Sequence, residues 1–550
     1  MSRRLPIVLL VVVALAAGLY AVRLPVLLHI SGWVSAIRNP VAPNREVHWQ
    51  RGPEAPSAPA GERPPNIVVI LFDDLGYNDV STYGGGMPEV PTPNIDAVAA
   101  AGVRFRNGYS ANAVCSPSRA SLLTGRYHSR FGFEYTPTPG NMARVAPMIG
   151  AENPRRLPVI VHPERAKDIA GFDELGMPPS EVTLAEMLKP AGYHNVHIGK
   201  WHLGGTPALR PLNQGFDESL YMENGLYLPV DHPQVVNSRQ DFDPIDRFLW
   251  ANMRYATSYN AGDWFEPGGY LTDYYSDEAV KVIEANRHRP FFLYLAHWAP
   301  HTPLQAAKAD YDALAHIHDH RRRVYGAMLR GVDRSVGRVR EALEAQGLTD
   351  NTLLIVTSDN GAPNYIGLPE VNRPFRGWKL TLFEGGVHVP YVAQWPARIP
   401  AGVDFAHPVS SIDIVPTAVA AAGAALPDDR PIDGANLLPH LLGETGTPPH
   451  DTLFWRDGSY RMVISRGWKL QLAERPDKVW LFHLDSDPTE QHEVSARYPD
   501  KVAELRTLLD AHEAQMAEPM WPSFVEMPVL VDKTLVDPES EDDEYVYWQN

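Results

Sequence analysis

Ile67-Val68-Val69-Ile70-Leu71-Phe72 is a continuous apolar run that ends in two acidic residues, Asp73 and Asp74. Such a run is typical of a strand buried on both faces, as in the centre of a parallel sheet. In sheets of this kind, ligands bind outside the carboxyl ends of the strands. This stretch therefore predicts an α/β fold and places Asp73 and Asp74 at its functional edge.

Three further apolar runs of the same kind lie at residues 195–198, 291–296 and 353–357. Helical patterns separate them, at residues 184–188 and from about 311 to 346. Strands that alternate with helices indicate a large, mostly parallel or mixed sheet with helices on both faces.

The C-terminal part of the chain has a different pattern. Short runs separated by turns indicate a small antiparallel sheet, and they lie at residues 451–455, 461–465, 469–472 and 480–484. A helix is expected from about 500 to 516, because Val502, Leu505 and Leu509 share one face. We expect an α/β catalytic domain at residues 66–440 and a smaller α+β subdomain at 441–550, with the acidic residues 539–544 on its solvated surface.

The N-terminus has the pattern of an export signal. Residues 5–22 are uncharged and follow Arg3 and Arg4, which fits a signal peptide or a membrane anchor over residues 1–30. Because arginines stay on the cytoplasmic side, the remaining chain is expected outside the cytoplasm, in a bacterial periplasm or on the cell surface. Repeated prolines predict an extended linker over residues 31–65.

Composition narrows the classes of function. The apolar fraction of 44% is that of a globular protein, and the formal net charge of -17 disfavours general binding of nucleic acid. An anionic substrate must therefore be held by a local group of basic side chains.

Polar residues follow each of the four predicted strands. They are Asp73-Asp74, Gly199-Lys200-Trp201-His202, His297 with His301, and Ser358-Asp359-Asn360. Each motif alone fits an ordinary turn, but four strand ends meeting at one rim favour a site. The hard oxygens of the aspartates and Asn360 favour calcium or magnesium over zinc.

Cys115 is the only cysteine in the sequence, so it can form no internal disulfide. A lone cysteine is ordinarily a small buried hydrophobe, but its neighbours indicate another role. Cys115-Ser116-Pro117-Ser118-Arg119 leads into Ala120-Ser121-Leu122-Leu123-Thr124-Gly125-Arg126. This Cys-x-Pro-x-Arg pattern resembles the signature of the type I sulfatases of the alkaline-phosphatase superfamily.

The resemblance extends from Asn66 to about Pro488. It includes Thr92-Pro93-Asn94-Ile95-Asp96, Gly215-Phe216-Asp217, Pro300-His301-Thr302-Pro303, Lys379 before Glu384-Gly385-Gly386, and Leu481-Phe482-His483-Leu484. It implies an alkaline-phosphatase-like fold and the hydrolysis of a sulfate ester.

The resemblance also implies a modified nucleophile and a metal ion. Cys115 would be oxidised after synthesis to formylglycine, an aldehyde, by a formylglycine-generating enzyme of the host. One calcium ion would be bound by the modified Cys115 together with Asp73, Asp74, Asp359 and Asn360.

Five further positions match residues that act on the substrate in the family. Arg119 and Lys200 would hold the hydrated aldehyde, with His202 as its base partner. His301 and Lys379 would face the sulfate group and the leaving group. One hydroxyl of the hydrate attacks sulfur, and the second allows sulfate to leave as the aldehyde reforms.

Two alternatives remain open from the sequence. A phosphonate monoester or phosphodiester hydrolase of the same superfamily would use the same nucleophile and metal ligands. A non-catalytic surface binding protein with a sulfatase fold is disfavoured, because all ten positions are filled.

A sulfated carbohydrate is the expected substrate. An exported enzyme meets polysaccharides, and a protein of net charge -17 favours a pocket over a long basic groove. Residues 131–181 carry a basic insertion that could receive a second anionic group, and it includes Arg144, Arg155, Arg156, His162, Arg165 and Lys167. Aromatic residues between 221 and 275 either stack on sugar or pack loops, and His128 and His297 either touch substrate or support the fold.

Overall fold

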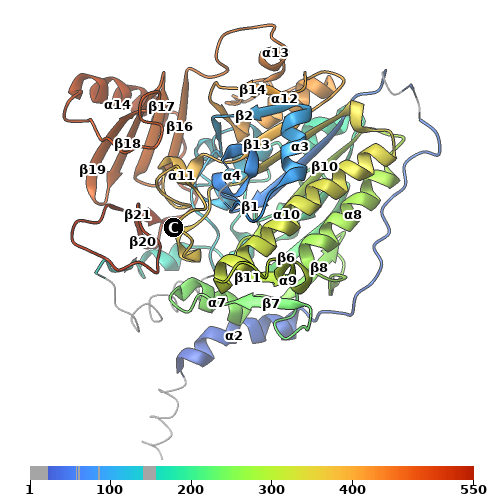
Figure 1. Ribbon diagram of the computed structural model, residues 1–550, viewed down its shortest axis with the longest axis horizontal. Helices are drawn as coiled ribbons and strands as arrows, with labels where there is room; N and C mark the ends of the chain where they lie inside the picture. Colours follow the sequence, from blue (N-terminus) through green and yellow to red (C-terminus); the bar gives the residue numbers. More distant parts are fainter. Residues whose placement is uncertain (1–22, 57, 60–61, 85–86, 140–155) are drawn as a thin grey trace, which may run out of the picture.

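The computed structural model describes residues 23–550 except 57, 60–61, 85–86 and 140–155 (Figure 1). Its centre is a ten-stranded sheet in the order β14-β2-β13-β12-β1-β10-β5-β6-β8-β9. The strands are β1 (Asn66–Asp73), β2 (Val103–Phe105), β5 (His194–Gly199), β6 (Glu218–Gly225), β8 (Tyr255–Tyr259), β9 (Trp264–Phe265), β10 (Phe291–Pro300), β12 (Thr352–Ser358), β13 (Tyr391–Gln394) and β14 (Val403–Phe405). β12, β1, β10, β5 and β6 are parallel, whereas β13 and β8 pair antiparallel beside them. The predicted mixed α/β sheet is thus confirmed.

Helices cover both faces of this sheet because the central strand is apolar on both. Val68, Ile70 and Phe72 pack into one core cluster, and Ile67, Val69 and Leu71 pack into another. The first cluster lies under α3 (Pro93–Ala101), α8 (Leu271–Ala285) and α10 (His320–Ala345). The second lies under α4 (Cys115–Thr124), α6 (Leu184–Leu188) and α12 (Ile414–Ala422). In Figure 1, α8 and α10 lie side by side over the first face.

The predicted long helix over residues 311–346 is wrong in one respect, because the chain forms two helices there. α9 (Lys308–Ala313) ends early, and Asp319 then caps α10 by accepting a hydrogen bond from the Arg322 amide at 2.7 Å. The remaining small elements of the body are β3 (Gly108–Tyr109) with β15 (Val409–Ser410), β7 (Val235–Ser238) with β11 (Leu304–Ala307), α7 (Pro244–Asn252), α11 (Glu384–Val387) and α13 (Leu438–Leu441).

The C-terminal region contains the predicted antiparallel sheet and helix. The sheet consists of β16 (Thr452–Asp457), β17 (Tyr460–Ser465), β18 (Trp468–Glu474) and β19 (Asp477–His483), and α14 (Pro499–Glu513) covers one face. The other face joins the main core, so Met462 and Trp480 belong to the same cluster as Phe72. The two regions share one apolar core.

A third sheet was not foreseen from the sequence. β20 (Val525–Leu530) pairs with β21 (Tyr545–Gln549) and with β4 (Ile160–Val161). Next to it, Glu544 accepts hydrogen bonds from Arg376 at 2.5 Å and from the Trp480 indole at 2.7 Å. The end of the acidic segment is therefore bound to the body and not fully solvated.

The N-terminal part that the structure describes begins with α2 (Arg23–Arg38), which packs against α7. The expected boundary at residue 30 falls inside this helix. Farther on, Val47 and Trp49 are buried, and the Trp49 indole donates to Glu278 at 2.7 Å, so this part of the proline-rich segment lies against the body. No helix among the described residues is both long and apolar enough to span a bilayer, and residues 5–22 lie outside them.

A buried ion cluster joins the two regions. The ammonium of Lys469 in β18 lies 2.8 Å from Glu384 Oε1 in α11 and 2.8 Å from Glu490 Oε1. All three side chains are buried, and Glu490 also accepts a hydrogen bond from the Glu384 amide at 2.6 Å. Lys469 thus offsets one of the two negative charges and lies between two carboxylates that would otherwise repel each other more strongly.

Replacing Lys469 by methionine should lower the free energy of unfolding by about 3–5 kcal/mol, because two carboxylates would stay buried without a cation. Urea unfolding followed by circular dichroism measures the change. Lys501→Met is the matched control: Lys501 forms an exposed pair with Glu504, and its loss should cost less than about 1 kcal/mol. Equal effects of the two substitutions would show that the buried cluster does not hold the regions together.

Candidate active site

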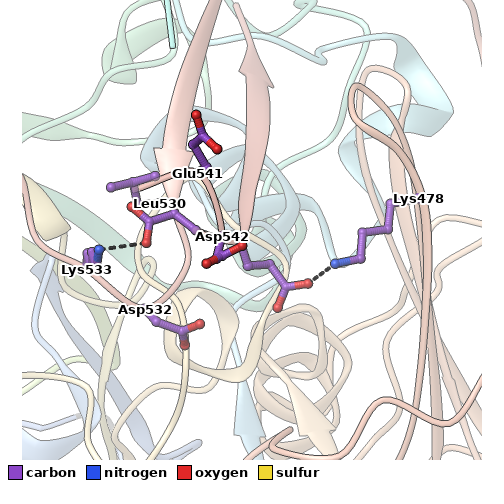
Figure 2. Close-up of a pocket in the computed structure, with 8 residues that line it drawn as sticks. Lys478, Leu530, Asp532, Lys533, Glu541 and Asp542 are labelled. Carbon is purple, nitrogen blue, oxygen red and sulfur yellow. Dashed lines mark hydrogen bonds and ion pairs between the residues drawn. The ribbon is translucent and has the colours of Figure 1, made fainter. Parts of the chain in front are cut away.

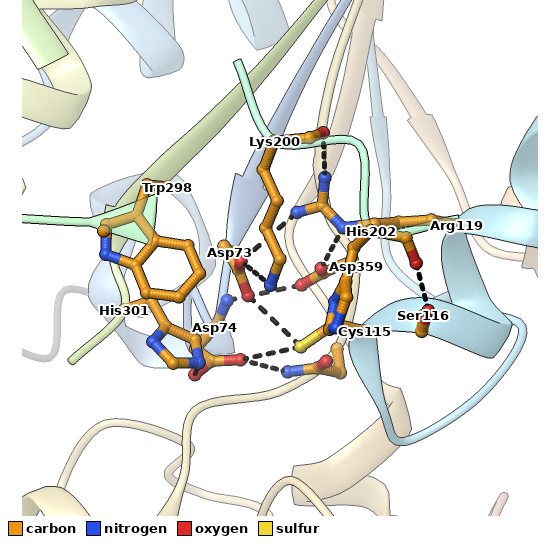
Figure 3. Close-up of polar contacts among 12 residues, drawn as sticks. Asp73, Asp74, Cys115, Ser116, Arg119, Lys200, His202, Trp298, His301 and Asp359 are labelled. Atoms are coloured by element: carbon orange, nitrogen blue, oxygen red, sulfur yellow. Dashed lines mark hydrogen bonds and ion pairs between the residues drawn. The ribbon is translucent and has the colours of Figure 1, made fainter. Parts of the chain in front are cut away.

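The carboxyl ends of four adjacent strands form the floor of the candidate site. Asp73 ends β1, Asp359 follows β12, Lys200 follows β5 and His301 follows β10. The strands are parallel neighbours, with Phe72 in register with Ser358. The convergence expected from the sequence is therefore observed (Figure 3).

The turn from β5 into the site requires a glycine. Gly199 has φ +107°, and a Cβ atom there would lie 2.0 Å from the carbonyl oxygen of Ala296 in the neighbouring strand. The glycine lets the strands stay in close contact while the chain turns and directs Lys200 towards Asp73.

Cys115 is the first residue of α4, whose N-terminus points into the site. Its Sγ lies 3.0 Å from Lys379 Nζ, 3.4 Å from Asp73 Oδ1 and 3.9 Å from Asp74 Oδ1. Arg119 follows one turn later on the same face of the helix. Both side chains are buried, with Cys115 only 3% exposed.

Three basic side chains face three carboxylates around this sulfur atom. Arg119 Nε donates to Asp359 Oδ2 at 2.8 Å, and its guanidinium lies 3.4 Å from Asp73 Oδ2. The other two pairs are Lys200 with Asp73, and Lys379 with Asp74 at 2.6 Å. The three positive charges of Arg119, Lys200 and Lys379 balance the three carboxylates.

Burial and neighbouring charges shift the pKa values of the three carboxyl groups. Burial alone would raise the pKa of Asp73, but Lys200, His301 and Arg119 outweigh it and hold that pKa well below its usual value. The pKa of Asp74 is raised by burial despite Lys379, and burial together with Asp73 raises the pKa of Asp359 to about 6. Two of the three carboxylates therefore carry an electrostatic cost that a divalent cation would relieve.

The donor atoms at this edge fit such a cation. Asp73, Asp74, Cys115 and His301 each offer one ligating atom, and these atoms lie within 4.8 Å of one another. Asn360 Nδ2 lies 2.7 Å from Asp74 Oδ1, and Asn360 Oδ1 is buried without a hydrogen-bond partner among the described residues. Oxygen-rich donors of this kind suit a hard cation such as calcium.

The thiol of Cys115 is poorly suited to act as a nucleophile itself. Burial and the neighbouring Asp73 raise its pKa well above the ordinary value. Cysteines that attack substrates directly have a lowered pKa, because the thiolate is the reactive form. This environment therefore disfavours a cysteine-type hydrolase.

Two histidines stand at the edge of the cluster. His301 Nε2 lies 3.4 Å from Asp74 Oδ2, and its Nδ1 lies 2.6 Å from the Thr302 carbonyl. His202 Nδ1 is buried without a partner among the described residues. Burial lowers the pKa of both rings well below the usual value, assisted by Lys379 for His301 and by Lys200 for His202.

Trp298 is part of the site and was missed in the sequence. Its ring packs against His301 at a tilt of 34° with centroids 4.1 Å apart, and Lys200 Nζ lies 4.6 Å from the same ring system. Figure 3 shows the indole beside both side chains. The only signal was its position three residues before His301, in a run that also fits a buried strand.

His128 and His297, which the sequence left as possible substrate contacts, are both buried and contact other residues of the protein. His128 lies 2.9 Å from Asn112 Nδ2 and 3.1 Å from the Phe133 carbonyl, and burial lowers its pKa to about 3. His297 stacks on Phe72 and lies 2.7 Å from Ser335 Oγ. Their contacts favour the structural alternative for both.

Several of the residues considered for carbohydrate binding have other partners or are not described. Arg144 and Arg155 lie outside the described residues. Arg165 donates to the Ser523 carbonyl at 3.1 Å, and His162 lies 2.8 Å from Glu526. Among the aromatic residues, Tyr227 stacks on Tyr270 and both are buried, which favours loop packing there.

Two surface hollows lie away from Cys115. One of about 380 Å³ is lined by acidic side chains that pair with lysines, as Figure 2 shows for Lys478 and Lys533. The other, of about 410 Å³, lies between the body and the C-terminal sheet and includes Tyr77, His388 and Arg466. Neither includes Cys115 or the side chains that contact it, and the acidic one would repel a sulfate group.

Comparisons with known proteins find relatives over most of the chain. A family model described as Sulfatase matches residues 65–424. The chain is 34% identical over 497 residues to human N-acetylgalactosamine-6-sulfatase, covering 83% of this chain and 87% of that protein. It is 36% identical over 413 residues to human arylsulfatase A, covering 72% and 70%.

The fold is also similar to solved structures. The crystal structure of Ps i-CgsB superposes with a TM-score of 0.70 at 31% identity, covering 84% of this chain and 95% of that chain. A second structure, of the same protein in complex with k-i-k-neocarrahexaose, gives a TM-score of 0.70 at 30% identity with the same coverage.

Proposed function

The chain belongs to the sulfatase family and is a sulfuric ester hydrolase, and we propose that it removes sulfate from a carbohydrate with an aldehyde made from Cys115 and one calcium ion. The observation that carries the proposal is the buried cluster in which three basic side chains and three carboxylates surround Cys115. With a divalent cation added, such a cluster would carry a net positive charge and could bind a small anion.

The environment of Cys115 supports its conversion to formylglycine. Formylglycine supplies a hydrated aldehyde whose two hydroxyls serve attack and release. Arg119 and Lys200 lie on the side of Asp73, where they would orient this hydrate. His202 Nδ1 has no partner among the described residues, so it can accept the proton that the release step needs.

Calcium would be held by Asp73, Asp74, Asp359 and Asn360 with the modified Cys115, and it would supply positive charge at the reacting sulfate. The basic and acidic side chains already balance, so a divalent cation leaves the site with a net charge of about +2. That local charge offsets the -17 of the whole chain and attracts a sulfate ester.

His301 and Lys379 are placed to act on the leaving group. Lys379 lies 3.0 Å from Cys115 Sγ, so its ammonium would contact an oxygen of sulfate bound there. His301 stands beside Asp74. Burial and Lys379 keep its pKa low without substrate, and the negative charge of a bound sulfate would raise that pKa, so that the ring would protonate the departing alkoxide. Trp298 packs against the ring of His301 and is a positioning residue.

A sulfated carbohydrate is the best-supported substrate. One relative is named for its action on an N-acetylgalactosamine sulfate, and a structural neighbour was solved with a carrahexaose. In this chain Cys115 is only 3% exposed, so a sulfate that projects from the end of a chain reaches it more easily than one within a polymer. The enzyme would act in a bacterial periplasm or at the cell surface, after maturation by a formylglycine-generating enzyme.

Rates on matched substrates test the reaction class. A sulfated amino sugar, a sulfated galactan oligosaccharide, an aryl sulfate and an aryl phosphodiester with the same leaving group should be compared. We expect kcat/KM for the aryl sulfate to exceed that for the phosphodiester by at least about tenfold, and at least one sugar to be desulfated. Faster cleavage of the phosphodiester would contradict the proposed activity, and Cys115→Ala should abolish turnover of both.

Metal content tests the proposed calcium site. Purified protein should contain about one calcium ion per chain by elemental analysis, and calcium should raise its melting temperature. Asp359→Ala should lose the metal and the thermal shift together. Asp79→Asn is the matched control, because Asp79 is a buried carboxyl group that binds Tyr325 and not the cluster. Stoichiometric zinc without calcium would refute the assignment.

Leaving-group dependence tests His301. His301→Ala should lower kcat on alkyl sulfates by about 10²–10⁴, but should lower it far less on activated aryl sulfates, which need little protonation. Equal losses on both classes would indicate that His301 only positions the substrate.

Trp298→Leu should reproduce part of this selective loss in kcat with little change in KM, because His301 would no longer be held in place. Trp298→Phe keeps an aromatic ring against His301 and should restore most of the activity on alkyl sulfates. If Trp298→Leu and Trp298→Phe lower kcat on alkyl sulfates equally, then Trp298 does not act through an aromatic contact with His301.

A further inference from the structure

α2 has two opposite faces with different surroundings. On one face Leu28 is buried, the Gly32 amide donates to Asn252 Oδ1 at 3.0 Å, and Ser35 Oγ accepts from Arg254 at 3.2 Å. On the other face four apolar side chains are exposed: Ile30 (44%), Trp33 (55%), Val34 (40%) and Ile37 (81%). Their spacing of three, one and three residues places them on a single stripe of the helix.

The inner face is fixed to the body by several polar contacts. Asn252 Nδ2 donates to the Leu28 carbonyl at 2.8 Å. Arg254 donates to Glu223 Oε1 at 2.7 Å and to the Asn39 carbonyl at 2.5 Å. Because these bonds join α2 to α7 and to β6, the helix cannot rotate to bury its outer stripe against the protein.

The outer stripe of α2 gathers more exposed apolar side chains than other parts of the described surface. The described residues contain eleven exposed large apolar side chains, and four of them lie on this stripe. Figure 1 shows α2 at the edge of the molecule, with α7 between it and the sheet. A soluble surface rarely gathers such side chains unless something covers them.

We propose that the outer stripe of α2, formed by Ile30, Trp33, Val34 and Ile37, lies in the interfacial layer of a lipid bilayer. The uncharged residues 5–22 run directly into this helix, and a run of that length matches the hydrocarbon core of a membrane. Tryptophan and isoleucine are side chains that enter the boundary between headgroups and acyl chains.

Charge indicates which lipid surface fits. With a net charge of -17 the protein gains nothing from anionic headgroups, so binding must come from burial of the apolar stripe. The membrane contact should therefore occur on zwitterionic vesicles and should not strengthen as the fraction of anionic lipid increases.

A fluorescent probe on the stripe tests this contact. Cys115 is buried, so Ile37→Cys introduces the accessible thiol for an environment-sensitive dye. The labelled full chain is reconstituted from mild detergent into phosphatidylcholine vesicles, with and without lipids that carry a quencher in the acyl chain. Ala36→Cys is the matched control, because Ala36 is exposed on the same helix but lies off the stripe; Leu508→Cys in α14 is a distant control.

The proposal predicts a blue shift at position 37 and at least about threefold stronger quenching there than at positions 36 and 508. Equal quenching at all three positions would overturn it. A doubled protein mass by light scattering in vesicle-free detergent solution, after the mass of bound detergent is subtracted, would also overturn it, because a second copy would then cover the stripe. Sulfate-ester hydrolysis should be unchanged in all three labelled proteins, so this result is independent of the proposed function.

Discussion

The pairing of three buried carboxylates with three buried cations around Cys115 is the constraint on which the structure depends. Removing six charged groups from water costs many kcal/mol unless each has a partner at close range. Asp73, Asp359 and Arg119 meet this requirement only if β1, β12 and α4 keep one relative position. The wide parallel sheet provides that position, because its central strands are buried on both faces.

The remainder of the fold supports the same cluster from outside. Lys379 lies in the connection just before α11, and Glu384 of α11 is bound by Lys469 of the C-terminal sheet. The smaller region is thus linked to a side chain that contacts Cys115, through a buried ion pair and a shared apolar core. This link gives a physical reason why a catalytic body of this kind carries a second sheet.

Much of this could be predicted from the sequence, where local pattern and chemistry coincide. β1 and β12 are continuous apolar runs, and β16 to β19 are short strands separated by turns, so periodicity found them. Nine of the ten site positions lie in motifs at strand ends or in the Cys-x-Pro-x-Arg pattern, Lys379 lies in the segment before Glu384-Gly385-Gly386, and the structure brings them to one edge.

Other features depend on contacts between distant residues and have no local signal. The sequence around Trp298 predicts only a buried strand, and the contact between its ring and His301 is visible only in the structure. Trp49 lies in a proline-rich segment that resembles a linker, yet it is buried by Glu278 and Tyr259. β4 consists of only two residues and lies far from β20 and β21 in the chain, so no local pattern predicts that the three strands form one sheet.

If Cys115 is the precursor of the nucleophile, then formylglycine attacks the substrate and the thiol does not. Mass spectrometry of the tryptic peptide spanning residues 107–119, from fully active protein made in a host that modifies such cysteines, tests it most directly. We predict a peptide in which the sulfur and two hydrogens of Cys115 are replaced by one oxygen, in proportion to activity. Full activity with only the unmodified thiol in that peptide would contradict it.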